Sequence, residues 1–307
     1  MINKRKPIDP GLAREWSDWA QITFMDALVQ SAPWTCNQIA FHGGTSLHLS
    51  WNSPRFSEDL DFLLLQEKSK DFDLIMSKVR QKMQSAVMLF DPSLTIEIKN
   101  KSKEESNLLS FHIVLSSPKK IIGNTMVKAE FWKVDSEYLD KYESEFVLPV
   151  KRNDVVSRIS QPIPAATLKS AYADKLTAFS TRPFLKWRDV FDLWWIGKQI
   201  DINPAEMSKL FLHHVSAYNT VDNKHPKQAL LQFLSLDIED VVKKSDPDLK
   251  KWLPAPLWNA LYPDGVRQMV MYTRDSLSKI SDQIDRNEIH VSPKNRPHKA
   301  KKIDINP

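Results

Sequence analysis

The stretch that decides the fold runs from residue 38 to residue 62 and reads QIAFHGGTSLHLSWNSPRFSEDLDF. It begins with a short apolar run that ends at two adjacent glycines, Gly43 and Gly44. Residues 45–51 then have the pattern of a short helix, and residues 59–65 have the pattern of a strand. The stretch therefore predicts a strand, a tight glycine turn, a helix and a second strand.

The glycine turn has the chemistry of a phosphate site. The chain contains only six glycines, and two of them stand together here. Glycine lets the backbone turn sharply and lets a bulky anion approach the main chain. The helix that follows, with Thr45 or Ser46 as its natural N-cap, offers free N–H groups and the positive end of its dipole. We therefore expect Gly43, Gly44, Thr45 and Ser46 to cradle nucleotide phosphates, although Ser46 could serve only as the cap.

Asp59 and Asp61 open the second strand and are two residues apart, so they project from the same face. Two neighbouring carboxylates repel each other unless a cation lies between them. Their hard oxygen atoms favour Mg²⁺, which also binds substrate phosphates. One or two such ions can activate an attacking oxygen and stabilise a leaving pyrophosphate. The alternative is a tight turn followed by two surface aspartates.

The two segments GGTSL (43–47) and RFSEDLDF (55–62) together resemble the signature of the DNA polymerase beta-type nucleotidyltransferase superfamily. More narrowly, they are similar to the AbiEii/AbiGii toxin family, the nucleotidyltransferase toxins of bacterial abortive-infection and type IV toxin–antitoxin systems. The resemblance implies that Asp59 and Asp61 are catalytic metal ligands, that an NTP is the substrate, and that a third carboxylate comes from a later strand. Nearby, Arg55 could hold a phosphate or pair with Glu58, and Ser57 could accept a proton or bond within the turn.

Glu130, in the predicted strand 126–134, is the candidate for the third metal ligand. Glu97, in the predicted strand 94–99, competes with it. The resemblance favours Glu130, because it lies on the last strand before the chain becomes helical. Many members of the family carry an aspartate at this point, and a glutamate places its carboxylate one carbon further out.

A second group of charged residues lies in KLTAFSTR (175–182) and RDVFDLW (188–194). On a helix, each segment brings its charged residues to one face. A lysine near a metal site can neutralise triphosphate charge, whereas the alternative is a network of surface salt bridges. The resemblance extends to both segments, and so runs from about residue 40 to residue 195. It implies that Lys175 binds nucleotide phosphates with Asp189 or Asp192 as its partner, and that Arg182 and Arg188 contact phosphate or pair with these aspartates.

The pattern along the chain predicts an α+β protein in three parts. A nucleotidyltransferase-fold α/β domain with a leading helix spans residues 1–160, an all-helical bundle spans 161–286, and a flexible basic tail spans 287–307. The resemblance supports this order of sheet and helices. The remaining predicted elements are helices at 11–31 and 69–89, a strand at 110–115, and helices at 165–181, 187–199, 204–217, 226–237 and 264–285.

Composition sets wider limits. The net charge of +5 and the pI of about 9.0 are compatible with a phosphate-rich partner. No run approaches the roughly 18 apolar residues of a membrane span, and the charged start has no signal-peptide pattern, so we expect a cytoplasmic protein without membrane contact. The single cysteine, Cys36, precludes an intrachain disulfide, and we expect it in a buried strand.

The expected function is therefore Mg²⁺-dependent transfer of a nucleoside monophosphate from an NTP to an acceptor hydroxyl. From the resemblance, the acceptor is an RNA, the 3′ end of a tRNA, and the protein is a toxin held in check by a cognate antitoxin protein. Two alternatives remain at this point. The same site could modify a protein hydroxyl, on the chain itself or on the antitoxin, or the protein could be an inactive nucleotide-binding module.

Overall fold

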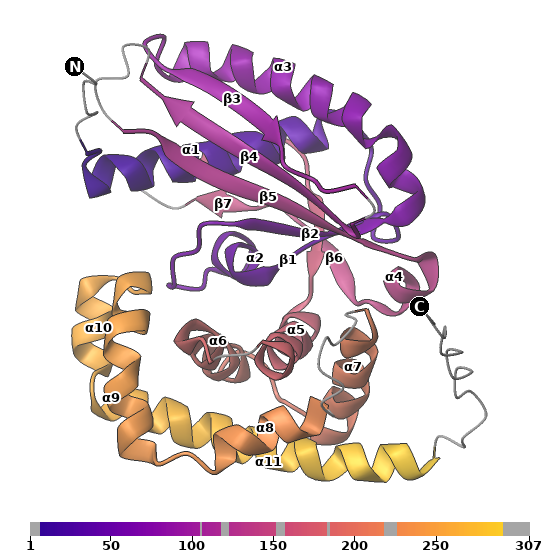
Figure 1. The fold of residues 1–307 in the computed structure, drawn as a ribbon, viewed down its shortest axis with the longest axis vertical. Coiled ribbons are helices and arrows are strands. Elements are labelled where there is room, and N and C mark those ends of the chain that lie inside the picture. The colour runs from indigo at the N-terminus through magenta and orange to yellow at the C-terminus, as the bar shows by residue number, and fades with distance from the viewer. Residues whose placement is uncertain are drawn as a thin grey trace, which may run out of the picture.

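The computed structural model describes residues 7–104, 106–117, 123–151, 157–182, 185–217 and 226–290. Over these residues the N-terminal half of the chain builds a mixed β-sheet with helices against it, and the C-terminal half is helical (Figure 1). The predicted α+β class is therefore confirmed. No helix in the described ranges is long and apolar enough to cross a membrane.

The main sheet of the described chain has seven strands in the order β3-β4-β5-β2-β1-β9-β6. β2 pairs with β5 and β1 pairs with β9 in parallel, while the other neighbours are antiparallel. The bounds are β1 Ile39–His42, β2 Leu60–Leu65, β3 Thr95–Asn100, β4 Leu108–Ser116, β5 Thr125–Val134, β6 Ser144–Val147 and β9 Ile163–Ala166, and a separate pair is formed by β7 Val150–Lys151 and β8 Ser157–Arg158.

A row of phenylalanines determines the register of the central strands. Phe41, Phe62 and Phe131 are Cα partners on β1, β2 and β5, and all three are buried. The rings of Phe62 and Phe131 stack with centroids 4.7 Å apart. Because side chains alternate between faces, burying this row on one face places the neighbouring residues of each strand on the other face. These neighbours include His42, which follows Phe41, and Asp61 and Glu130, which precede Phe62 and Phe131.

Helices α1 (Pro10–Val29) and α3 (Phe72–Phe90) cover the phenylalanine face (Figure 1). Asp9 caps α1 by accepting the backbone N–H groups of Gly11 and Leu12, and Pro10 occupies the first helical position. The buried residues of α3 recur at helical spacing and pack into the same core. This layer makes the sheet a rigid support for residues on its other face.

The opposite face packs against the helical half through a second core, which includes Ala40 and Leu63 of the sheet and Leu176 of α5. In Figure 1, α5 and α6 lie between the sheet and the long helix α11. The remaining bounds are α2 Gly43–Trp51, α4 Ser136–Lys141, α5 Leu168–Thr181, α6 Trp187–Gly197, α7 Pro204–Ser216, α8 Pro226–Leu234, α9 Ile238–Leu249, α10 Ala255–Leu261 and α11 Asp264–His290, with 3-10 helices η1 Gln66–Asp71 and η2 Lys250–Trp252.

Several sequence expectations need correction. α2 begins at Gly43 with His42 as its N-cap, so the expected cap at Thr45 or Ser46 is wrong. The helix expected from residue 165 begins only at Leu168, because the residues before it form β9, and the sheet thus continues past residue 160. Cys36 is half-buried in a turn rather than in a strand. The structure also adds β6 to β9, α4, α9 and α10, which the sequence patterns did not predict.

The expected basic tail starts within a helix. α11 continues to His290 and so includes the first four residues of the expected tail, 287–290. Residues 291–307 lie outside the described residues, and they include Lys294, Arg296, Lys299, Lys301 and Lys302.

Candidate active site

Three polar residues form a row across the middle of the sheet. His42 at the end of β1 is the Cα partner of Asp61 on β2, and Asp61 is in turn the partner of Glu130 on β5. All three project from the face that packs against the helical half, because the phenylalanine row occupies the other face. Asp59 directly precedes β2, near enough to Asp61 and Glu130 for the three charges to interact.

The carboxylates of Asp59, Asp61 and Glu130, which we call the acidic row, destabilise one another. Burial raises the pKa of Asp59, and the charge of Asp61 raises it further. Burial also raises the pKa of Glu130, followed by the charges of Asp61 and Asp59. Lys128 partly opposes both shifts. A divalent cation between these groups would remove the repulsion and favour their charged forms.

The donor atoms suit a hard cation such as Mg²⁺, since all of them are carboxylate oxygens. Within the part of the chain that the structure describes, no three His, Cys, Asp or Glu side chains are already grouped as a metal site. Asp59, Asp61 and Glu130 therefore fit a metal by their chemistry and mutual repulsion. Their role as its ligands stays a prediction.

Close approaches explain both glycines of the turn. Gly43 has a φ of +77°, and a Cβ atom on it would lie 2.5 Å from Oδ2 of Asp61. A Cβ atom on Gly44 would collide with the guanidinium of Arg55 and lie 2.8 Å from Oγ of Ser57. No side chain caps the first N–H groups of α2. The turn thus brings Asp61 and uncapped backbone donors to the same place.

Gly43→Ala should reduce activity much more than it reduces stability. An L-residue in this backbone region costs about 1–2 kcal/mol, and the new methyl group would also push the Asp61 carboxylate aside. A displacement of that kind can cost roughly a hundredfold in rate. Nucleotidyl transfer and thermal unfolding should be measured together. Gly123→Ala is the matched control, because its Cβ atom would meet its nearest neighbour, the N atom of Ile8, at 3.4 Å. Equal activity of both variants would contradict the role of the turn.

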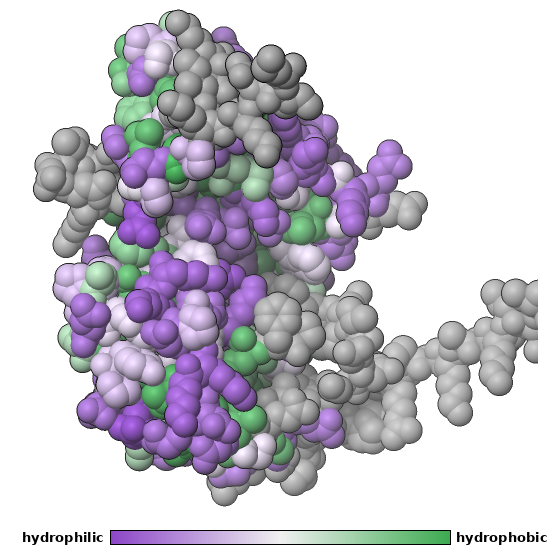
Figure 2. All heavy atoms as spheres, turned by 60° about the vertical axis from the view of Figure 1, so that its left-hand side comes forward, coloured by the Kyte–Doolittle hydropathy of each residue, from purple (hydrophilic) through white to green (hydrophobic). Residues whose placement is uncertain are grey.

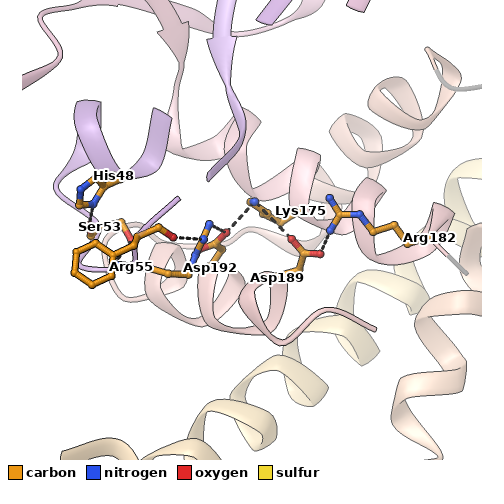
Figure 3. A network of polar contacts seen from close by, with 8 residues as sticks. His48, Ser53, Arg55, Lys175, Arg182, Asp189 and Asp192 are labelled. Atoms are coloured by element: carbon orange, nitrogen blue, oxygen red, sulfur yellow. Dashed lines mark hydrogen bonds and ion pairs between the residues drawn. The ribbon is translucent and has the colours of Figure 1, made fainter. Parts of the chain in front are cut away.

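The cationic side of the site is built on α5 and α6 (Figure 3). Arg55 donates from Nε and Nη2 to the two carboxylate oxygens of Asp192, at 2.7 and 2.8 Å. Nζ of Lys175 lies 2.8 Å from Oδ2 of Asp192. Arg55 and Asp192 are buried almost completely. Asp192 therefore fixes the loop before β2 to the helical half and holds Lys175 in place.

Asp189 completes this network one turn earlier on α6. Its Oδ1 lies 3.5 Å from Nζ of Lys175, and its Oδ2 accepts a hydrogen bond from Arg182 (Figure 3). Burial would raise the pKa of Asp192, but the charges of Arg55 and Lys175 outweigh it and lower that pKa. The network therefore keeps its carboxylate charged in a buried position. Arg188 is placed differently, with its guanidinium carbon 5.1 Å from the centroid of the Trp252 ring.

Asp174 on α5 connects the acidic row to the helical half through His42. Its Oδ2 lies 3.3 Å from Nδ1 of His42 and accepts the hydroxyl of Tyr142 at 2.7 Å, while its Oδ1 lies 2.9 Å from Nδ1 of His214. Burial disfavours the charged imidazole of His42, but the hydrogen bond and charge of Asp174 prevail and raise its pKa. His42 thus lies between Asp61, its Cα partner on β2, and Asp174 on α5.

A cavity of about 230 Å³ lies between the glycine turn, the loop that carries Asp59, and helices α5 and α6. Its walls include most of the predicted site residues, namely Gly43, Gly44, Arg55, Ser57, Asp59, Asp61, Lys175, Arg182, Arg188 and Asp189. Asp59 and Asp61 line it from the sheet, and Lys175 and Arg188 line it from α5 and α6. The surface between the two halves, viewed from the side of α9 and α10, is mainly hydrophilic (Figure 2).

Four predicted residues, Thr45, Ser46, Glu130 and Asp192, do not line the cavity. Thr45 is buried, and its hydroxyl donates a hydrogen bond to the backbone oxygen of Asp59, so it ties α2 to the loop that carries Asp59. Ser46 is also buried. Asp192 acts through Arg55 and Lys175, and Glu130 is placed by its pairing with Asp61.

The competitor Glu97 lies on the outer strand β3, which β4 separates from β5, and it pairs with Lys99 at 3.1 Å. The pairing of Arg55 with Glu58 is not observed, since Arg55 binds Asp192. The sequence patterns did not select Asp174, Thr177, Ala178 and Thr181, which also line the cavity. Their spacing on one face of the helix that carries Lys175 is the signal that could have found them.

Comparisons with known proteins identify a family for this chain. The model of the family described as nucleotidyl transferase AbiEii toxin, type IV TA system, matches residues 26–275. No curated protein matches significantly. Among solved structures, the nucleotidyltransferase toxin MenT4 of Mycobacterium tuberculosis H37Rv is 16% identical, with a TM-score of 0.54 over 90% of this chain and 91% of that chain. JHP933 from Helicobacter pylori is 14% identical, with a TM-score of 0.49 over 91% of this chain and 95% of that chain.

Proposed function

The chain belongs to the nucleotidyl transferase AbiEii toxin family of type IV toxin–antitoxin systems, and we propose that it transfers a nucleoside monophosphate from an NTP to the 3′-hydroxyl of a tRNA in a Mg²⁺-dependent reaction. Membership in this family makes the chain a nucleotidyltransferase of the toxin class. The proposal adds the metal, the RNA acceptor and the roles of individual residues, with a cognate antitoxin protein and the bacterial cytoplasm as its setting.

One observation supports the reaction more than any other. A single cavity has the acidic groups Asp59 and Asp61 on one wall and the cations Lys175 and Arg182 on another, with the start of α2 between them. A triphosphate needs cations and backbone donors along its oxygens, and the reacting phosphate needs a metal held by carboxylates. An isolated network of surface salt bridges would not require this arrangement around a cavity.

In the proposed reaction, the acceptor oxygen forms a bond to the α-phosphorus while the bond from that phosphorus to the bridging oxygen breaks. Pyrophosphate leaves, and the hydroxyl proton passes to solvent. Asp59, Asp61 and Glu130 would hold one or two Mg²⁺ ions, which supply charge neutralisation and activate the attacking oxygen. Lys175 neutralises the triphosphate, and the N–H groups of Gly43 and Gly44 bind its oxygens.

The other predicted residues position this machinery. Asp192 and Asp189 orient Lys175, and Arg55 anchors the loop that leads to Asp59. Arg182 and Arg188 line the cavity and can turn to phosphate when a nucleotide binds. Ser57 lies on the cavity wall beside the glycine turn, and Thr45 and Ser46 support the turn from behind.

The test is transfer of label from α-³²P-labelled ATP, CTP, GTP and UTP to total tRNA in the presence of Mg²⁺. We expect label in tRNA with the wild-type protein, and none when EDTA replaces the metal. The preferred nucleotide is read from the same experiment. Label on protein alone would replace the proposal with modification of a protein hydroxyl. Bound nucleotide without any transfer, even with excess tRNA, would indicate an inactive binding module.

A further inference from the structure

A second cavity, of about 530 Å³, adjoins the candidate active site. Arg188 lines both cavities. We call the second one the basic pocket and define it by Lys186, Arg188, Lys244, Lys251, Trp252 and Asp248, which come from α6, α9, η2 and the segment before α6. Four of these six residues are cations and one is an acid.

Cations outnumber acids among the residues that line the basic pocket. The pKa of Lys186 is lowered by partial burial first and then by the charges of Arg182 and Arg188, which Asp189 and Asp248 only partly oppose. Asp248 accepts the backbone N–H of Trp187 at 3.0 Å and lies 3.6 Å from Nζ of Lys251. A polyanionic ligand would relieve the repulsion that remains among the cations.

Trp252 places an aromatic surface among these cations. The guanidinium carbon of Arg188 lies 5.1 Å from its ring centroid, and Nζ of Lys251 lies 5.3 Å from it. The backbone oxygen of Trp252 accepts the N–H of Phe56 at 2.8 Å, which ties the pocket to the loop that carries Arg55. Cations around an aromatic ring suit single-stranded nucleic acid, because phosphates bind the cations and a base stacks on the ring.

We propose that the basic pocket binds the single-stranded 3′ end of the RNA acceptor, with its phosphates on Lys186, Lys244 and Lys251 and a base against Trp252. This inference rests on the proposed function, since it places the strand whose 3′-hydroxyl must reach the cavity of Asp59 and Asp61. Arg188 marks the junction between the acceptor strand and the nucleotide.

The double variant Lys244→Ala/Lys251→Ala tests the pocket, and both lysines are exposed, so the fold should be retained. Binding of a fluorescein-labelled single-stranded RNA is measured by anisotropy without NTP. We expect Kd to rise roughly tenfold, and the salt dependence of log Kd to weaken by about one unit per lysine. The KM for NTP should not change. Lys78→Ala, an exposed lysine of α3 on the far side of the sheet, should behave as wild type.

The outcomes separate this inference from the proposed function. Unchanged RNA affinity and salt dependence in the double variant would overturn the inference. An equal loss of NTP binding would also overturn it, because the pocket would then belong to the nucleotide site. Displacement of the RNA by polyglutamate at equal charge concentration would indicate an acidic protein ligand instead. If the wild-type protein labels protein and not RNA, the proposed function fails, while the RNA affinities still decide the role of the pocket.

Discussion

Asp61→Asn is expected to lower nucleotidyl transfer by roughly a thousandfold or more, because the substitution removes a proposed metal ligand at the centre of the acidic row. Stability should change in the opposite direction. The charge of Asp61 raises the pKa of both Asp59 and Glu130, so its removal relieves repulsion in the protein without metal. We therefore expect the melting temperature without Mg²⁺ to be equal to or above that of wild type. Transfer assays and thermal unfolding on the same preparation check both statements.

Glu97→Gln is the matched control for the acidic row. Glu97 also lies on a strand of the sheet, but it is exposed and pairs with Lys99 at the edge. The variant should retain wild-type transfer, whereas Glu130→Gln should lose most of it. The reverse result, with Glu97 essential and Glu130 dispensable, would show that the third carboxylate is misassigned. An active Asp61→Asn variant would show that the metal site is elsewhere.

Asp192→Asn is expected to lower the free energy of unfolding by about 3–5 kcal/mol, the usual result of removing one partner from a buried ion pair. Its carboxylate holds Arg55 and Lys175, and all three side chains are buried. Without that charge, two buried cations retain only weaker partners, such as Asp189 at 3.5 Å from Lys175. Transfer should also fall, because the loop before Asp59 loses its anchor. Urea unfolding with wild type as reference measures the change.

The effect of Asp192→Asn should depend on pH in a defined direction. The pKa of Asp192 is lowered in the folded protein, so its contribution to stability is present above the unfolded pKa of about 4 and is lost as the pH falls below it. The difference between variant and wild type should therefore shrink on acidification. Asp189→Asn should lower the free energy of unfolding by less than Asp192→Asn does, because the partner of Asp189, Arg182, is about one-third exposed. Equal losses for both variants, or a difference that grows at low pH, would contradict this account.

The sequence predicted the local structure around the cavity well. The glycine pair and the alternation of apolar and acidic residues are signals that lie within residues 38 to 62. β1 and β2 formed where these signals indicated, and α2 begins two residues earlier than predicted, at Gly43. Glu130 was selected through a family resemblance, and the register of β2 with β5 places it beside Asp61. The strands could be predicted because the alternation of side chains along a strand depends on only a few consecutive residues.

Contacts between distant segments could not be predicted in the same way. Arg55 and Asp192 are 137 residues apart, and only the packing of α6 against the loop before β2 brings them together. The predicted helix starts at residue 165 and so includes the last two residues of β9, because the sequence Ile-Pro-Ala-Ala lacks strand character and gains it by pairing with β1 and β6. α9 contains Pro247, which local rules count as a helix breaker.

The most direct test of the central claim compares transfer to intact tRNA with transfer to tRNA whose terminal ribose has been cleaved by periodate. The account predicts label from α-³²P-NTP on intact tRNA only. The proposed reaction forms a bond from the 3′-hydroxyl oxygen of the tRNA to the α-phosphorus, and the oxidised RNA lacks this hydroxyl. Release of the label as the 3′-terminal nucleotide after nuclease digestion would confirm its position. Equal labelling of both RNAs, or label found only on protein, would contradict the account.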